Sequence, residues 1–356
     1  MIVRRSPDDL AAYRSRVLGS LLGGALGDAL GAPIEFDSID GIRRQYGLAG
    51  VTGPVPDSLG KVGLVTDDTQ MTLFTLEGLI RGGDVSAVRN AYLRWLDTQR
   101  LPGPSHSSGW LGEQGWLYAR RAPGNACMSG LTYGFAGPAP FGERGPVNPE
   151  SKGCGTVMRS APFGYGARDA REAFELAARC AQITHGHPTG YLAAGAFAAM
   201  VHLVLAGEPL GSAVQGAADL LADHPAHEET SLALRAAVRL AEQGDPSPER
   251  VESLGGAWVA EEALAIAVYC ALVHPGPGDL RRALLLAVNH SGDSDSTGAV
   301  CGNLLGALHG HRSLPTDWLA DLEGRETITD LADDFVTWTT GETSTDGSWE
   351  KRYPRD

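Results

Sequence analysis

The residues best suited to chemistry lie in a short acidic run near the C-terminal end of the chain. Residues 292–298 read Gly-Asp-Ser-Asp-Ser-Thr-Gly, so two carboxylates alternate with hydroxyl groups. In an extended segment this alternation would direct Asp293 and Asp295 to the same side. Carboxylate and hydroxyl oxygens are hard ligands that suit Mg²⁺, Mn²⁺ or Ca²⁺. The run therefore predicts a site for a divalent cation.

The same run invites two other interpretations. As an EF-hand loop it would begin at Asp293 and place Gly298 at the sixth position. The twelfth position of such a loop needs a bidentate glutamate, but here it is Leu304. As a simple helix start, the run would need only the capping that Asp and Ser commonly provide. The EF-hand is therefore excluded, whereas capping stays open as an alternative.

A second acidic run also opens a helical stretch. Residues 66–69 read Thr-Asp-Asp-Thr. Adjacent carboxylates repel each other, and a helix cap needs only one of them. Two such runs in one chain favour a cation shared between Asp67 and Asp68 on one side and Asp293 and Asp295 on the other.

Composition limits the class of protein. The chain has 356 residues, 43% of them hydrophobic, and a formal net charge of −14. The length allows one large domain or two ordinary ones, with a substantial core. The negative charge argues against non-specific binding to nucleic acid or to anionic membranes. The five cysteines are widely spaced and form no C-x-x-C pair, which argues against a disulfide framework or a zinc site.

No segment is typical of export or membrane insertion. Residues 1–10 are polar and lack the apolar core of a signal peptide. The most apolar stretch, residues 191–206, is short for a bilayer span and contains His202, so we expect a buried core helix. These features predict a soluble, cytoplasmic protein, and we expect it to be a monomer.

Helical periodicity predominates and strand-like alternation is nearly absent, so we predict an all-α fold in a single domain over residues 1–356. The glycine- and proline-rich residues 101–155 contain aromatic side chains that favour packing over disorder. The tail, residues 340–356, either folds back through Trp349 and Tyr353 or is mobile. The predicted helices span residues 9–31, 67–81, 85–100, 111–121, 170–183, 188–207, 211–223, 228–243, 258–274, 278–290, 297–311 and 325–340.

Two predicted helices carry glycine at every fourth position. These are residues 19, 23, 27 and 31 in the first, and residues 298, 302, 306 and 310 in the second. Glycine inside a helix costs about 0.5–1 kcal/mol relative to alanine, and close approach of two helix backbones would compensate for that cost. We therefore hypothesise that the two helices pack against each other. Their contact would bring Glu35, just past the first helix, towards Asp293 and Asp295.

Five motifs in order, spread over most of the chain, resemble the ADP-ribosylglycohydrolase family. They are Gly-Gly-Ala-Leu-Gly-Asp at residues 23–28 with Glu35 downstream, Thr-Asp-Asp-Thr at 66–69, Gly-Cys-Gly-Thr-Val-Met-Arg at 153–159, Thr-His-Gly-His at 184–187, and the acidic run at 292–297. Each motif alone is weak, but the five together are specific. The resemblance implies a compact orthogonal bundle of helices around two divalent cations, Mg²⁺ or Mn²⁺.

The resemblance also implies roles for single residues. Glu35 stands where the family keeps a catalytic glutamate, with Asp68 and Asp293 beside it; the other interpretation of Glu35 is a surface glutamate after a proline-containing turn. At the position of Ser296, an implied metal ligand, many relatives have threonine; Thr297 would be the substitute ligand for Ser296. The implied metal ligands are Thr66, Asp67, Asp68, Asp293, Asp295 and Ser296. Cations held in this way would orient the vicinal hydroxyls of a ribose, and nearby carboxylates would stabilise an oxocarbenium-like transition state.

Further residues would bind the rest of ADP-ribose. Glycine-rich turns that contain Asn125 and Gly153 offer backbone N–H groups for phosphate oxygens. By resemblance, the cleft also includes Gly155, Thr156, Met158 and His185. The alternative for His185 is a buried histidine that caps the helix before Pro188. Cys154 is interpreted as a small packing residue instead of a nucleophile because no acidic or basic residue is adjacent to it. Trp258 is interpreted as a core tryptophan at a helix start.

The leading hypothesis is a divalent-metal-dependent hydrolase that cleaves the N- or O-glycosidic bond between ADP-ribose and a modified protein or other acceptor, and releases ADP-ribose. Arginine-directed relatives have a further catalytic aspartate in the loop after the third helix. Here that loop, residues 101–109, holds no carboxylate, and Asp97 lies before it, so the acceptor stays open. The alternatives are a catalytically idle module that binds ADP-ribose or a nucleotide, and an unrelated dinuclear-metal phosphohydrolase.

Overall fold

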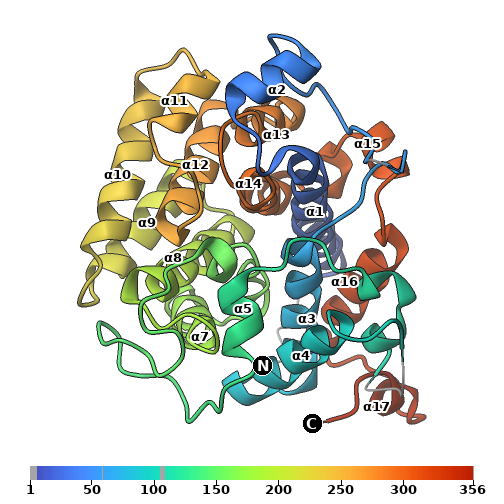
Figure 1. The fold of residues 1–356 in the computed structure, drawn as a ribbon. Helices are drawn as coiled ribbons and strands as arrows, with labels where there is room; N and C mark the ends of the chain where they lie inside the picture. The colour runs from blue at the N-terminus through green and yellow to red at the C-terminus, as the bar shows by residue number, and fades with distance from the viewer. Residues whose placement is uncertain (1–5, 58, 105–108, 356) are drawn as a thin grey trace.

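The computed structural model describes residues 6–57, 59–104 and 109–355, which form helices and no strand (Figure 1). Short 3-10 helices connect the α-helices: η1 (Ala32–Ile34), η2 (Leu111–Glu113), η3 (Gly115–Tyr118), η4 (Cys154–Thr156) and η5 (His311–Ser313). The α-helices are α1 (Pro7–Gly31), α2 (Ile39–Tyr46), α3 (Asp67–Arg81), α4 (Val85–Thr98), α5 (Asn125–Gly130), α6 (Phe163–Gly166), α7 (Ala170–Ala181), α8 (Pro188–Leu205), α9 (Leu210–Ala222), α10 (Glu228–Glu242), α11 (Pro248–Glu252), α12 (Ala260–Val273), α13 (Leu280–Val288), α14 (Ser294–His309), α15 (Thr316–Ala320), α16 (Arg325–Thr340) and α17 (Ser348–Arg352). The all-α prediction is confirmed.

Two helix predictions are wrong. Residues 111–121 form the short turns η2 and η3 instead of an α-helix, because Gly112 and Gly115 weaken helix propagation. Helix α14 begins at Ser294 and not at residue 297, because Asp293 caps it. Residues 105–108 of the predicted irregular stretch lie outside the described part of the chain.

Helices α1 and α14 lie side by side in the middle of the molecule (Figure 1). Their glycine ridges face each other so closely that a Cβ atom on Gly23 would lie 2.4 Å from the carbonyl oxygen of Gly302. The register is fixed by a reciprocal pair of hydrogen bonds: Ser20 Oγ donates to the Asn303 carbonyl and Asn303 Nδ2 to the Ser20 carbonyl, each at 2.8 Å. The predicted packing of the two helices is therefore confirmed.

The other helices surround this central pair. Helices α7 to α12 lie on one side of it, and α3, α4 and α16 on the other (Figure 1). Both α1 and α8 are long and apolar enough to cross a membrane, but 89% and 83% of their most apolar windows are buried inside the fold. Helix α8 is thus the core helix that residues 191–206 were expected to form.

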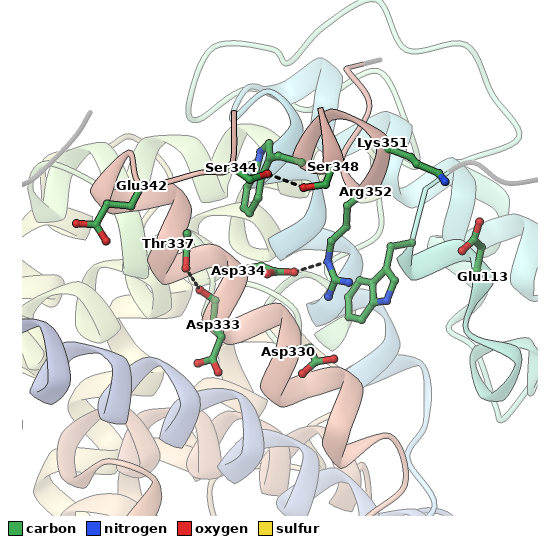
Figure 2. A pocket seen from close by; sticks show the side chains of 12 residues that line it. Glu113, Asp330, Asp333, Asp334, Thr337, Glu342, Ser344, Ser348, Lys351 and Arg352 are labelled. Carbon is green, nitrogen blue, oxygen red and sulfur yellow. Dashed lines mark hydrogen bonds and ion pairs between the residues drawn. The ribbon is translucent and has the colours of Figure 1, made fainter. Parts of the chain in front are cut away.

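The C-terminal segment folds back onto α16 (Figure 2). Asp334 Oδ2 on α16 accepts hydrogen bonds from Arg352 Nε and from the Tyr353 hydroxyl, both at 2.6 Å, and the Arg352 guanidinium lies 3.7 Å from the Trp110 ring centroid. Tyr353 is buried by these contacts. A cavity of about 770 Å³, here called the C-terminal groove, remains between α16 and this segment; it is lined by Trp110, Glu113, Asp330, Asp333, Asp334, Thr337, Glu342, Ser344, Ser348, Trp349, Lys351 and Arg352.

Candidate metal centre

The start of α3 is anchored to α1 by a buried carboxylate. Asp28, on α1, accepts hydrogen bonds from the backbone N–H groups of Thr66 (3.0 Å) and Thr69 (3.1 Å) and from the Thr69 hydroxyl (2.5 Å). Thr66 caps the helix by accepting the Asp68 N–H at 3.3 Å. With the helix start held in this way, the Asp67 and Asp68 side chains are buried.

The start of α14 is positioned by a tight backbone contact. The Asp293 N–H donates to the Gly256 carbonyl at 3.0 Å. Gly292 has a φ of 133°, and a Cβ atom there would lie 2.2 Å from the same carbonyl oxygen, so only glycine fits. Asp293 is the N-cap and Asp295 lies in the first helical turn, where its carboxylate accepts the Ser296 N–H at 2.8 Å. The two aspartates therefore meet through helix-start geometry, and the expectation of an extended segment is wrong.

The two helix starts and Glu35 share one cavity of about 360 Å³. Carboxylate oxygens of Glu35, Asp293 and Asp295 lie within 4.8 Å of one another, and Asp67 and Asp68 line the same cavity. We call these five residues the carboxylate cluster. Glu35 follows η1 directly after α1, so the glycine-mediated packing of α1 on α14 carries it to the cluster, as the packing hypothesis predicted.

The carboxylate cluster lacks positive charge. Of the described residues that line the cavity, none is lysine or arginine. Burial, followed by repulsion from Asp293, Asp67 and Asp28, raises the pKa of Glu35 to about 8, and burial is the main cause that raises the pKa of Asp67 to about 7. Burial and neighbouring carboxylates also raise the pKa of Asp68 and Asp295 well above the usual range. Such a cluster needs protons or cations to be stable.

The donor set fits a hard divalent cation. One oxygen of Asp68, Oδ2, is buried without a hydrogen-bond partner among the described residues. A buried carboxylate oxygen without a hydrogen-bond partner can coordinate a cation. An all-oxygen donor set suits Mg²⁺ or Mn²⁺ better than Zn²⁺.

The two hydroxyl ligands implied by the resemblance differ in position. Ser296 lines the cavity, whereas Thr66 lines a neighbouring one and turns its hydroxyl to the backbone of α3. Thr297, the substitute for Ser296, donates to the Ala287 carbonyl at 2.7 Å and faces away from the cluster.

The residues expected to bind substrate are only partly together. Asn125, Gly153, Gly155, Met158 and His185 line the cavity. Thr156 is fully buried beside them, and its hydroxyl donates to the Gly190 carbonyl at 2.7 Å, so it does not line the cavity.

His185 is a buried residue of the cavity wall. Its Nδ1 lies 2.8 Å from the Thr184 hydroxyl, and burial lowers the pKa of the imidazole to about 3, with help from the Arg159 charge. The imidazole is therefore neutral at physiological pH. The cap of α8 is His187, whose Nδ1 accepts the Thr189 N–H at 3.2 Å, so the capping interpretation of His185 is wrong.

For Cys154 the expected absence of a nucleophilic role agrees with the structure but the reason given for it does not, and the expectation for Trp258 is wrong. The Cys154 thiol donates to Asp293 Oδ2 at 2.7 Å, although no acidic residue is close to it in sequence. Burial raises the pKa of this thiol well above its usual range, so it stays protonated and is not a nucleophile. Trp258 is 46% exposed and precedes α12 instead of starting it in the core.

Phe36 and Asp28 are site residues that sequence reasoning did not single out. Phe36 is 72% exposed and stacks on Trp258 with ring centroids 5.5 Å apart, and both rings line the cavity. Nothing in the hydrophobic pattern signals this pair. Asp28 ends the glycine-rich motif at residues 23–28, so its position in that motif was a usable signal.

Known proteins resemble the chain along most of its length. The sequence profile of the ADP-ribosylglycohydrolase family matches residues 9–344. The ADP-ribosyl-[dinitrogen reductase] glycohydrolase of Rhodospirillum rubrum is 28% identical over 321 residues, which cover 88% of this chain and 92% of that protein. The bovine ADP-ribosylhydrolase ARH3 is 26% identical over 346 residues, covering 89% and 91%. A solved structure titled ADP-ribosylglycohydrolase-related protein complex is 25% identical and matches with a TM-score of 0.62, over 92% of this chain and 99% of that one. The chain therefore belongs to the ADP-ribosylglycohydrolase family.

Proposed function

We propose that this protein is a divalent-metal-dependent hydrolase that cleaves the glycosidic bond between ADP-ribose and a modified acceptor and releases ADP-ribose. The observation that carries the proposal is the carboxylate cluster, in which acidic groups from both ends of the chain line one buried cavity without a basic residue among its described lining. Family membership supports the hydrolase assignment, because the relatives named above are ADP-ribosyl hydrolases by name.

The residues of the cluster have complementary roles in this proposal. Two divalent cations, Mg²⁺ or Mn²⁺, would be held by Asp67, Asp68, Asp293, Asp295 and the Ser296 hydroxyl, which line the same cavity, and would fix the vicinal hydroxyls of the ribose. The Cys154 thiol and the Gly256 carbonyl hold Asp293 in place through its side chain and backbone. The negative charge of Asp68 and Asp293 stabilises positive charge that develops at the anomeric carbon.

Glu35 is the general acid and base of the proposed reaction. None of the described residues donates a hydrogen bond to its carboxylate, so the group is available to substrate. It gives a proton to the leaving nitrogen or oxygen of the acceptor and takes one from the attacking water. The other end of the substrate lies along the glycine-rich turns, where the backbone N–H groups at Gly153 and Gly155 and the Asn125 side chain bind the diphosphate. The neutral His185 imidazole adds a hydrogen-bonding group there.

The test is release of ADP-ribose from proteins that are mono-ADP-ribosylated on arginine, on serine or on other acceptors, with Mg²⁺ or Mn²⁺ present. We expect release from at least one acceptor, and we expect EDTA to abolish it. Binding of ADP-ribose without release from any acceptor would indicate an idle binding module. Release of inorganic phosphate without ADP-ribose would indicate a phosphohydrolase. Either result would contradict the proposed function.

A further inference from the structure

A second cavity adjoins that of the carboxylate cluster and shares Glu35 with it. It has a volume of about 310 Å³ and lies between the end of α1 and the segment of residues 55–66. Three residues line both cavities: Glu35, Phe36 and Ala122. We call the second one the side cavity; its own lining includes Ala29, Ala32, Val55, Lys61, Leu64 and Arg121.

The backbone at Ala122, which lines both cavities, is held in place by its neighbour Arg121. Arg121 donates to both carboxylate oxygens of Glu323, at 2.6 and 2.9 Å, and to the Val65 carbonyl. Its neighbour Ala122 has a φ of 45°, a left-handed conformation that costs energy in a residue with a Cβ atom. Backbone strain of this kind persists only where the surrounding contacts hold it, so the fold maintains this conformation of Ala122.

The shape of the substrate requires two openings. In ADP-ribose joined to a protein, the diphosphate and the acceptor are attached at opposite ends of the distal ribose. The proposed diphosphate contacts at Gly153 and His185 lie in the first cavity. Glu35 must reach the bond to the acceptor, and Glu35 also lines the side cavity. The acceptor end of the substrate therefore points into the side cavity.

Two exposed apolar residues lie in or next to the lining of the side cavity. Phe36 is 72% exposed, and Leu59, in the turn between the side-cavity residues Asp57 and Lys61, is 81% exposed. Asp57 Oδ1 accepts the backbone N–H groups of Leu59 and Lys61 at 2.8 Å each, which holds Leu59 beside the side cavity. Exposed apolar side chains beside a cavity are typical of a contact with another protein. The net charge of −14 argues against a nucleic acid there.

We propose that the side cavity is the acceptor subsite: it receives the ADP-ribosylated side chain of a protein, whose surface contacts Leu59 and Phe36. This inference rests on the function proposed above and adds where the acceptor binds. It assigns Ala32 and Leu59 to acceptor recognition, apart from the metal ligands and the diphosphate contacts.

Filling the side cavity tests the proposal. In an Ala32→Phe variant, kcat/KM for an ADP-ribosylated protein should fall by about 100-fold or more, because the added ring occupies the acceptor's place. The Kd for free ADP-ribose, measured by calorimetry with Mg²⁺ present, should stay within about threefold, because free ADP-ribose carries no acceptor. Ala206→Phe, on the exposed end of α8, is the matched control and should leave both values unchanged.

A second variant avoids any effect on folding. Leu59→Ser changes an exposed side chain, and it should raise KM for the ADP-ribosylated protein by about tenfold while kcat stays constant. The KM for a single ADP-ribosylated amino acid, which cannot reach Leu59, should not change. A wild-type protein inactive on every acceptor would refute the proposed function itself. Three results would refute the acceptor subsite alone. The first is an active wild type whose Ala32→Phe and Leu59→Ser variants have unaltered kinetics. The second is a parallel loss of ADP-ribose binding in Ala32→Phe, and the third is faster turnover of ADP-ribosylated DNA or RNA than of protein.

Discussion

The carboxylate cluster and the C-terminal groove are both rich in acidic residues, yet they hold their charges in opposite ways. In the groove, Asp334 is paired with Arg352 and Tyr353, and Asp333 with Arg14 at 2.6 Å. The Asp333 side chain is 38% exposed, so water also screens its charge, although one of its oxygens lacks a protein partner. Asp333 and Asp334 therefore each have a basic partner that balances their charge without a metal ion.

The cluster has little exposure to solvent and no basic partner among the described residues that line its cavity. Its five carboxyl groups are at most 8% exposed, and no lysine or arginine lines their cavity within the described part of the chain. The groove is the larger cavity, at about 770 Å³ against about 360 Å³, and it also has five acidic residues in its lining. Burial without countercharge, and not the number of carboxylates or the size of the cavity, distinguishes a candidate metal centre.

The largest expected effect is on catalysis. Asp295→Asn should reduce ADP-ribose release by at least about 10³-fold, because it removes a ligand from cations that supply several kcal/mol of transition-state stabilisation. The matched change in the groove, Asp330→Asn, should leave the rate unchanged. Comparable losses in both variants, measured with a single ADP-ribosylated protein, would contradict the distinction between the two regions.

The next effect separates catalysis from metal binding. Glu35→Gln should lower kcat by about 10²- to 10⁴-fold, the usual contribution of a general acid or base. Because the amide keeps the shape of the side chain, the affinity for ADP-ribose should change little, and calorimetry would check it. A variant that retains wild-type kcat would show that Glu35 is only a neighbour of the cluster.

The cluster also depends on a helix contact that the groove does not need. A side chain at Gly302 would collide with the Gly23 carbonyl, so Gly302→Leu should lower the free energy of unfolding by about 3 kcal/mol or more. Gly211, on α9, has open space around its Cβ position, and Gly211→Leu is the control. Urea unfolding of both variants would measure the difference; equal midpoints would mean that the close approach of α1 and α14 is dispensable.

The raised pKa values predict how pH affects the metal-free protein. Below about pH 3, Glu35 and Asp67 are protonated in both folded and unfolded chains, and their contribution to stability is fully present. As pH rises towards the folded pKa of about 7 for Asp67 and about 8 for Glu35, the unfolded chain loses protons first and that contribution is lost.

The metal-free protein should therefore melt on the order of 5 °C lower at pH 8 than at pH 5, and Mg²⁺ should raise Tm more at pH 8. Calorimetry with EDTA or with Mg²⁺ would measure this. A metal-free Tm that rises with pH would contradict the view that the buried cluster lacks countercharge.

The smallest effect is expected in the groove. Asp334→Asn weakens the contacts with Arg352 and Tyr353. Because the Asp334 and Arg352 side chains are partly exposed, the free energy of unfolding should fall by only about 1 kcal/mol. Activity should not change. Loss of ADP-ribose release in this variant would mean that the C-terminal segment supports the site, and that the groove and the carboxylate cluster are not independent.

Local patterns made much of this molecule predictable. Glycine at every fourth position of two distant segments was enough to predict that α1 packs on α14 and that Glu35 lies near Asp293 and Asp295. The acidic runs and hydroxyl residues were enough to predict oxygen ligands. These features are periodic or contiguous in sequence, so helix geometry and the chemistry of neighbouring side chains are enough to interpret them.

Other features depend on contacts between remote segments. The hydrogen bond between Cys154 and Asp293 joins residues 139 positions apart, and no spacing in the sequence predicts it. Trp258 was expected in the core because tryptophan is usually buried, but it stacks on Phe36 at the surface of the cavity. The start of α14 was placed too late because alternating Asp and Ser suit an extended segment as well as a helix cap.

The most direct test of the central claim is an anomalous-scattering map from crystals soaked with Mn²⁺. We expect two ordered manganese peaks among Asp67, Asp68, Asp293 and Asp295, and no peak in the C-terminal groove. A map without ordered metal between the two pairs of aspartates, or with metal only in the groove, would contradict the proposal that both ends of the chain meet around a catalytic metal centre.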